Sequence, residues 1–247
     1  MENFDEEENA DYTVEDGVLT FYEVGKSEEV TVPDGVKKIG ESAFVGSLSK
    51  MRTVILPEGV EELEETAFMD CATLERVDLP QTLKVIGDSA FSCDFSLAEV
   101  KIPLGCEVGN YSFSSCDNIT DIDLHNAVSI GEGAFMSCVS LEKAHINDII
   151  EDIPDLAFSF CTSLTDLKLP RSLKHIGIGA FSDCRSLLEV DLPDGVEAIE
   201  KNAFEGCTVL REIFIPKSVT RVGKKIFAGC KNITVYCEEL SKPEDWD

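Results

Sequence analysis

Apolar positions in this chain follow a pattern that returns about every 23 residues. Each return carries a phenylalanine, usually preceded by alanine, and subtracting the residue numbers gives spacings of 24, 23, 22, 22, 23, 23, 23 and 23. These phenylalanines are Phe44, Phe68, Phe91, Phe113, Phe135, Phe158, Phe181, Phe204 and Phe227. A nearly constant period of this length predicts stacked structural units rather than a compact catalytic domain.

Residues 176–199 form the clearest copy of the unit, which reads IGIGAFSDCRSLLEVDLPDGVEAI. Val190 and Leu192 are separated by one polar residue, as in a β-strand with one buried face. Apolar steps of three elsewhere in the copy suit short turns and 3₁₀-like arcs, because they are not sustained for the length of a helix. Proline ends the strand in most copies, and glycine then marks a second corner where positive φ and close packing are expected.

A single unit cannot bury its own apolar side, but stacked units form one continuous core with parallel strands about 4.8 Å apart. We expect an acidic flexible arm over 1–11 and an N-terminal cap or half-repeat over 12–33, with a hairpin turn at Asp16-Gly17. A solenoid of about nine repeats follows over 34–237, and an acidic tail over 238–247.

The consensus I-G-x-x-A-F-x-x-C-x-x-L-x-x-V-x-L-P-x-x-L-x-x-I resembles the BspA-like, or treponemal, class of leucine-rich repeat. The resemblance covers about residues 15–237, and several columns agree in eight to nine copies. It implies a curved solenoid, surface or host-interaction roles in many members, and no shared catalytic residues. We therefore expect an α/β-type repeat solenoid: a right-handed leucine-rich repeat coil with one parallel β-sheet, short turn or 3₁₀ arcs opposite, and little regular helix.

The chain is strongly acidic: 21 Lys and Arg against 48 Asp and Glu give a formal charge of −27. This balance argues against nucleic acid and anionic membranes as partners, since both need a basic surface. The chain contains no run of about 20 apolar residues, so the sequence predicts no membrane-spanning segment. The start MENFDEEENADY lacks the features of a signal peptide, so we expect a cytoplasmic protein if Met1 is native, and an exported or cell-surface protein if a signal peptide was removed.

The ten cysteines are read as structural, small buried apolar side chains, including Cys237 on the last strand. Seven of them stand three residues after a repeat phenylalanine, where a small buried apolar side chain fits the unit. A disulfide framework is not favoured, because parallel Cβ vectors in a ladder give poor disulfide geometry. The chain has neither a CxxC pair nor histidines at ligand spacing, so we expect no metal and no other cofactor.

Candidate catalytic chemistry is sparse, and we do not expect an enzyme. Of the three histidines, His125 and His175 are read as surface positions at turns. His145 occupies an outward strand slot, where a pair with Asp123 in the neighbouring copy would bind an ion or titrate near neutrality; the other reading is a solvated face of mixed charge. Between Phe91 and Phe135 the period shortens, which indicates either drift or a recognition patch over 91–147.

The outward strand slots form the candidate partner-binding face, because a solenoid sheet presents such columns as one broad surface. The two columns are Asp78, Lys101, Asp123, His145, Lys168, Asp191 and Phe214, and Arg76, Glu99, Asp121, Lys143, Asp166, Glu189 and Glu212. Phe214 and Tyr236 are either an aromatic anchor for a protein or packing against the C-terminal cap.

The expected function is non-catalytic binding of a protein through this face. The alternative is a secreted or surface adhesin, or a glycan-binding module, of a bacterium. Glycan binding is the less favoured of these, since the outward columns hold few aromatic side chains. The partner is not identified by the sequence, and no oligomeric state is indicated.

Overall fold

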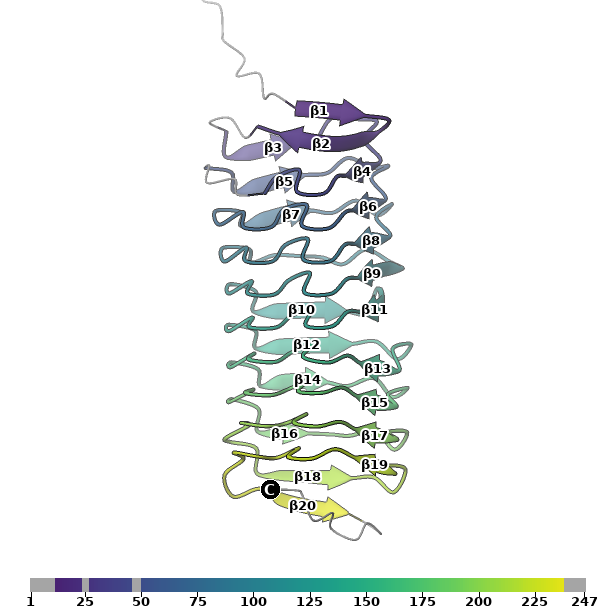
Figure 1. Cartoon of the computed structure of the whole chain (residues 1–247), viewed down its shortest axis with the longest axis vertical. Coiled ribbons are helices and arrows are strands. Elements are labelled where there is room, and N and C mark those ends of the chain that lie inside the picture. The colour runs from purple at the N-terminus through teal and green to yellow at the C-terminus, as the bar shows by residue number, and fades with distance from the viewer. Residues whose placement is uncertain (1–11, 24–26, 46–49, 238–247) are drawn as a thin grey trace, which may run out of the picture.

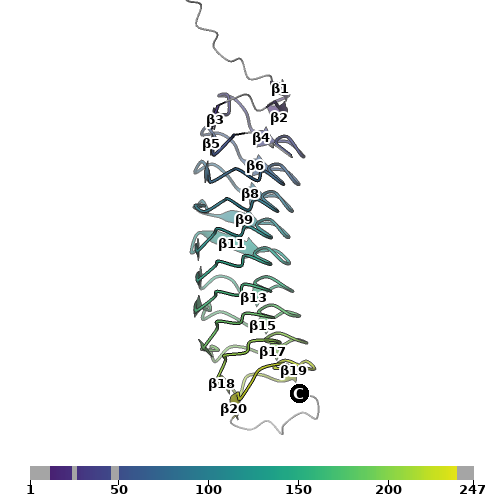
Figure 2. The same ribbon diagram turned by 90° about the vertical axis from the view of Figure 1, so that its left-hand side faces the viewer.

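The computed structural model describes residues 12–23, 27–45 and 50–237. Over these residues the chain winds into a solenoid of stacked coils, with β1 at one end and β20 at the other (Figure 1). The view turned by 90° shows the coils lying one on the next along the whole length (Figure 2). The described residues contain β-strands and turns but no helix. The prediction of a repeat solenoid is therefore confirmed, and the segments between its strands are turns and irregular backbone.

One parallel ladder occupies the strand slot that the repeat predicted, and we call its outward surface the sheet face. Its strands pair within three groups, β3-β5-β7, β10-β12-β14 and β16-β18-β20. They are β3 (Glu29–Thr31), β5 (Thr53–Ile55), β7 (Arg76–Asp78), β10 (Asp121–Leu124), β12 (Lys143–Ile146), β14 (Asp166–Lys168), β16 (Glu189–Val190), β18 (Glu212–Ile215) and β20 (Thr234–Cys237).

A second ladder runs along the other side of the solenoid, at the right of Figure 1, where the sequence predicted only corners. Its strands pair as β1-β2-β4-β6-β8-β9-β11 and β13-β15-β17-β19. They are β1 (Tyr12–Glu15), β2 (Val18–Tyr22), β4 (Lys38–Ile39), β6 (Glu62–Leu63), β8 (Val85–Ile86), β9 (Cys106–Val108), β11 (Ala127–Ile130), β13 (Asp152–Ile153), β15 (His175–Ile176), β17 (Ala198–Ile199) and β19 (Arg221–Val222). The expectation of a single sheet is thus wrong. Most of these strands have only two residues, too few to show a period of two in the sequence.

The repeat phenylalanines form one buried column through the core. Neighbouring rings are stacked, with centroids 4.6 Å apart for Phe44 and Phe68 and 6.0 Å apart for Phe204 and Phe227. The backbone of the arc is tied to the next coil as well, since the N–H of Phe68 donates to the carbonyl oxygen of Ala90 at 2.8 Å. Like positions of successive coils therefore lie over one another, as the repeat predicted.

The N-terminal hairpin extends this column. β1 and β2 pair antiparallel around Asp16-Gly17, as the turn signal predicted. The buried ring of Tyr22 stacks on Phe44 with centroids 4.9 Å apart, and Tyr12 stacks on Tyr22 at 6.1 Å. Two tyrosines thus cover the open end of the phenylalanine column. The predicted acidic arm over 1–11 and the tail over 238–247 lie outside the described residues.

The glycines of the second corner serve close packing rather than positive φ. At Gly131 an added Cβ atom would lie 2.4 Å from the backbone nitrogen of Asn110, and at Gly177 it would lie 2.5 Å from that of Asp155. Neither glycine is among the residues with positive φ. The expectation of close packing at this corner is correct, whereas positive φ is found at other positions of the coil, such as Gly105.

The cysteines are not bridged by disulfides, and most of them are buried. None of the ten cysteines is bridged; seven are buried, Cys93 and Cys230 are half-buried, and Cys237 is exposed. The reading of Cys237 as a buried residue is therefore wrong, because it lies on the last strand, whose outer side no further coil covers in the described part of the chain. The buried thiols also act as donors: Cys138 Sγ donates to the carbonyl oxygen of Phe113 at 3.1 Å.

Candidate binding face

The sheet face presents every predicted outward residue to solvent, fully or in part. All 14 are exposed or half-buried, including half-buried Asp78, His145 and Asp166. Most of the strand residues between them, such as Ile122 and Ile213, are buried in the core. The strand alternation therefore assigned inside and outside correctly along this ladder.

The breaks between the three groups of strands divide the face. In the middle group, Asp121, Lys143 and Asp166 lie opposite one another in one column, with alternating charge. In the adjacent column of the same group, Asp123 lies opposite His145, which lies opposite Lys168.

The two ends of the face differ from the middle. Towards the N-terminus, Glu99 is joined to Arg76 by an isolated bridge, and Lys101 lies outside any strand. Towards the C-terminus, Glu189 lies opposite Glu212, and Phe214 lies opposite Tyr236.

The histidines of the middle group make contacts that the sequence did not predict. Asp123 accepts a hydrogen bond of 3.0 Å from the backbone N–H of His125 and also contacts the Nδ1 atom of that ring. The backbone hydrogen bond lowers the pKa of Asp123. His145 Nε2 lies 3.5 Å from Asp166 Oδ2 instead. Asp123 and His145 share a register, but each contacts a different side chain.

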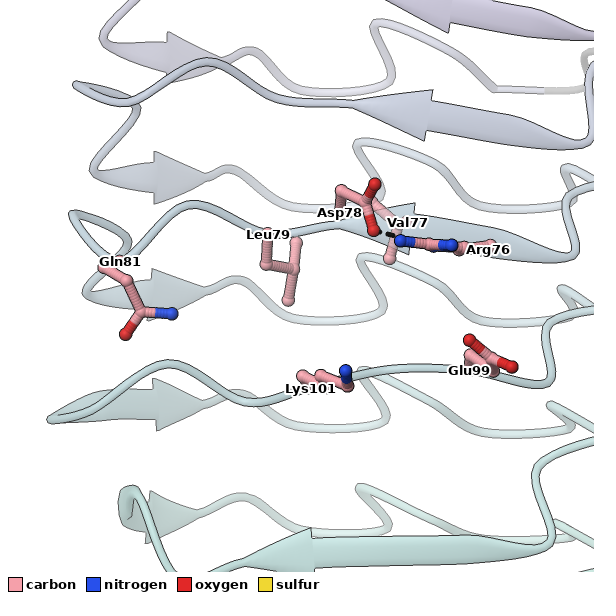
Figure 3. A pocket seen from close by; sticks show the side chains of 7 residues that line it. All are labelled: Arg76, Val77, Asp78, Leu79, Gln81, Glu99 and Lys101. Carbon is pink, nitrogen blue, oxygen red and sulfur yellow. Dashed lines mark hydrogen bonds and ion pairs between the residues drawn. The ribbon is translucent and has the colours of Figure 1, made fainter.

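The first hollow on the sheet face lies where the ladder lacks a regular strand (Figure 3). Its volume is about 260 Å³, and polar residues around it include Arg76, Asp78, Gln81, Glu99 and Lys101. Arg76 Nε donates to Asp78 Oδ1 at 2.7 Å, so this cation is already paired. Glu99 and Lys101 come from the following coil (Figure 3). The hollow carries both signs of charge and selects no single class of ligand.

A second hollow, of about 350 Å³, lies over β16, β18 and β20. Its polar lining is the three carboxylates of Glu189, Asp191 and Glu212, and its aromatic lining is Phe214 and Tyr236. Phe214 is 46% exposed and Tyr236 is 51% exposed. About half of each side chain is therefore open to solvent. This hollow differs from the first in holding one sign of charge.

The irregular middle of the chain contains structural polar groups. Asn147 stands where most copies have proline, and its buried Nδ2 donates to the carbonyl oxygens of Leu124 at 3.0 Å and Ala127 at 2.6 Å. Its Oδ1 accepts from the N–H of Ile149 at 3.0 Å. Asn147 thus ties two coils together, and these contacts give its departure from the pattern a structural reason.

The described part of the chain shows neither a cluster of metal-ligating side chains nor a membrane-spanning helix. Within it, no three His, Cys, Asp or Glu side chains come together as a metal site requires. It also contains no helix of sufficient length and apolar character to cross a bilayer.

The repeat is matched by a family model described as the BspA type leucine rich repeat region, over residues 17–130 and 106–234. The chain belongs to the BspA-type leucine-rich repeat family. No curated protein matches it in sequence. Among solved structures, this BspA-type protein shares its fold with the pneumococcal vaccine antigen PcpA, at 20% identity and a TM-score of 0.53, over 93% of this chain and 80% of the other.

Two further crystal structures are similar to this BspA-type protein. A leucine-rich repeat protein of T. pallidum is 28% identical, with a TM-score of 0.46, over 91% of this chain and 88% of its own. A leucine-rich cell surface protein of Faecalibacterium prausnitzii A2-165 is 20% identical, with a TM-score of 0.39, over 94% of this chain and 93% of its own.

Proposed function

We propose that this BspA-type protein is a non-catalytic protein-binding module whose partner docks on the sheet face. The observation that carries the proposal is the exposure of two columns of charged and aromatic side chains along one hydrogen-bonded ladder. The residues between them are packed in a continuous core, so the face is rigid before a partner arrives. A preformed surface binds without the cost of ordering its own backbone.

A protein fits this face better than the other classes of partner. Both signs of charge alternate in the middle group, which suits a surface of mixed charge rather than a polyanion. Glycan-binding surfaces depend on aromatic platforms, and Phe214 and Tyr236 are the two aromatic side chains on the described sheet face. The family and its solenoid fold are typically non-catalytic. The two hollows on the described sheet face hold no nucleophile next to a base.

A capture experiment tests the proposal. The tagged protein is used to isolate partners from the source cell, alongside a face variant, Asp121→Lys with Glu212→Lys. The control variant, Glu107→Lys with Glu197→Lys, makes the same change in net charge on and beside the second ladder, where both residues are exposed. We expect the control to retain a partner that the face variant loses. Loss in both variants, or in neither, would show that the sheet face is not the docking surface.

A surface location is the second candidate, and it is compatible with the first. PcpA, which has the same fold, is described as a pneumococcal vaccine antigen, and this description motivates the second candidate. Protease treatment of intact source cells tests the location: a surface protein is degraded before the cells lyse, whereas an internal one is degraded only afterwards.

A further inference from the structure

The aromatic rings of the second hollow lie side by side on the last two strands of the sheet face. Phe214 on β18 lies opposite Tyr236 on β20 in a parallel register. Ile213 and Ile215, on either side of Phe214, are buried, so the ring of Phe214 points away from the core. Two half-exposed rings at neighbouring positions form an apolar surface that water covers in the isolated protein.

The charged residues that line this hollow are all acidic. Glu189 lies opposite Glu212 in the register of β16 and β18, and Asp191 completes the lining. Like charges directly opposite on neighbouring strands are unfavourable. Within the described residues none of the three carboxylates forms an ion pair, whereas Asp78 in the first hollow is paired with Arg76. The three carboxylates of the second hollow are therefore open to a cation that a partner supplies.

A guanidinium group satisfies both features of the hollow. It stacks on aromatic faces, donates hydrogen bonds to carboxylates in a planar fork, and is weakly hydrated, so it leaves water at a low cost. An anionic ligand would be repelled, and a purely apolar one would remove water from the carboxylates without a partner for them. The volume of about 350 Å³ suits one or two long side chains rather than a folded element.

We infer that the hollow lined by Glu189, Asp191, Glu212, Phe214 and Tyr236 binds arginine side chains from a basic segment of a protein partner. This inference rests on the proposed function and names the chemistry of the partner at one end of the sheet face. The rings hold the guanidinium planes, and the carboxylates neutralise their charge. The other strands of the sheet face make the remaining contacts with the partner.

The test measures binding of a fluorescent nine-residue peptide, in which arginine alternates with glycine, to the full chain by anisotropy. The same peptide with citrulline in place of arginine keeps the shape and loses the charge; a lysine version keeps the charge and loses the planar group. At about 150 mM salt, exposed charges more than about 8 Å apart are largely screened, so contact at the hollow dominates.

Two pairs of variants separate the hollow from the rest of the surface. Phe214→Ala with Tyr236→Ala removes the rings, and Phe95→Ala with Phe160→Ala removes two other aromatic side chains, each 44% exposed. Glu189→Gln with Glu212→Gln removes two charges from the hollow, and Glu107→Gln with Glu197→Gln removes two exposed charges on and beside the second ladder, away from the sheet face. Circular dichroism confirms that each variant is folded.

We expect Phe214→Ala with Tyr236→Ala to raise the Kd of the arginine peptide about tenfold or more. Glu189→Gln with Glu212→Gln should raise this Kd by a smaller factor. The lysine peptide should bind the unchanged protein more weakly than the arginine peptide does, by a factor that is also smaller. The two control pairs should bind as the unchanged protein does, and the citrulline peptide should bind weakly. No binding of the arginine peptide, equal binding of the citrulline peptide, or equal losses in a control pair would overturn the inference. The capture experiment judges the proposed function separately, because it reports any partner lost by the face variant whatever its charge.

Discussion

Asp94 Oδ1 accepts a hydrogen bond of 2.7 Å from the backbone N–H of Cys71. The Asp94 side chain is fully buried in the column where other coils have a thiol. Burial, together with the nearby charge of Asp70, raises the pKa of Asp94 to about 9, although the bond from Cys71 works in the opposite direction. The carboxyl group is therefore neutral at pH 7 in the folded protein.

The unfolded chain releases this proton near pH 4, so the free energy of unfolding falls as pH rises between about 4 and about 9. Each pH unit in this window costs about 1.4 kcal/mol. Asp94→Asn keeps an acceptor for Cys71 and removes the titration, so we expect it to stabilise the protein by about 2–4 kcal/mol at pH 7.

Urea unfolding at a series of pH values measures this effect. The stability difference between Asp94→Asn and the unchanged protein should grow with pH across the window and vanish near pH 4. The exposed Asp121→Asn is the control and should show no such growth. A difference that is constant with pH would mean that Asp94 does not carry a raised pKa.

Phe135 tests the role of the ring column. Its ring is fully buried and stacks on Phe113 at 5.5 Å and on Phe158 at 5.4 Å. Phe135→Ala leaves a cavity between two coils, and we expect a loss of about 3–5 kcal/mol in the free energy of unfolding. Phe160→Ala removes a ring that is 44% exposed and should change it by less than about 0.5 kcal/mol. Equal losses in thermal or urea unfolding would contradict the assignment of the phenylalanine column to the core.

The phenylalanine column could be predicted from sequence because each ring has the same neighbours in every coil. Tyr22 extends the column 22 residues before Phe44, within the range of the repeat spacings. It was missed because the repeat was recognised by phenylalanine after alanine, and here tyrosine follows Phe21. The second ladder was missed for a related reason: a strand such as Val85–Ile86 has one inward and one outward residue and no alternation to detect.

The candidate face was predicted in part. Strand alternation identified its outward residues, since the side-chain period of a strand fixes which side each residue takes. The division of the face into separate hollows was not predicted, because it depends on where ladder hydrogen bonds fail, as they do around Lys101. The contact between Asp123 and His125 likewise depends on the local turn that follows β10.

Gly131 and Gly105 show two different reasons for glycine in a coil: close packing at Gly131 and positive φ at Gly105. An added Cβ atom at Gly131 would lie 2.4 Å from the backbone nitrogen of Asn110, so Gly131→Ala must push two coils apart. We expect it to lower the free energy of unfolding by about 3 kcal/mol or more. At Gly105 nothing lies within 4 Å, but φ is +80°, so Gly105→Ala should cost only about 1–2 kcal/mol. Denaturant unfolding compares them; a smaller loss for Gly131→Ala would show that close packing does not require glycine at this corner.

Thiol reactivity tests which cysteines are buried in the folded protein. Burial raises the pKa of Cys106 and of Cys138 to about 12, so almost no reactive thiolate is present in these side chains at pH 8. With a chromogenic disulfide reagent, the native protein should release one equivalent rapidly, from exposed Cys237, and up to two more slowly, from half-buried Cys93 and Cys230. The remaining seven should react only after denaturation, and Cys237→Ser should remove the rapid phase. Rapid reaction of more than three thiols in the native protein would show that the coils do not enclose the seven buried cysteines.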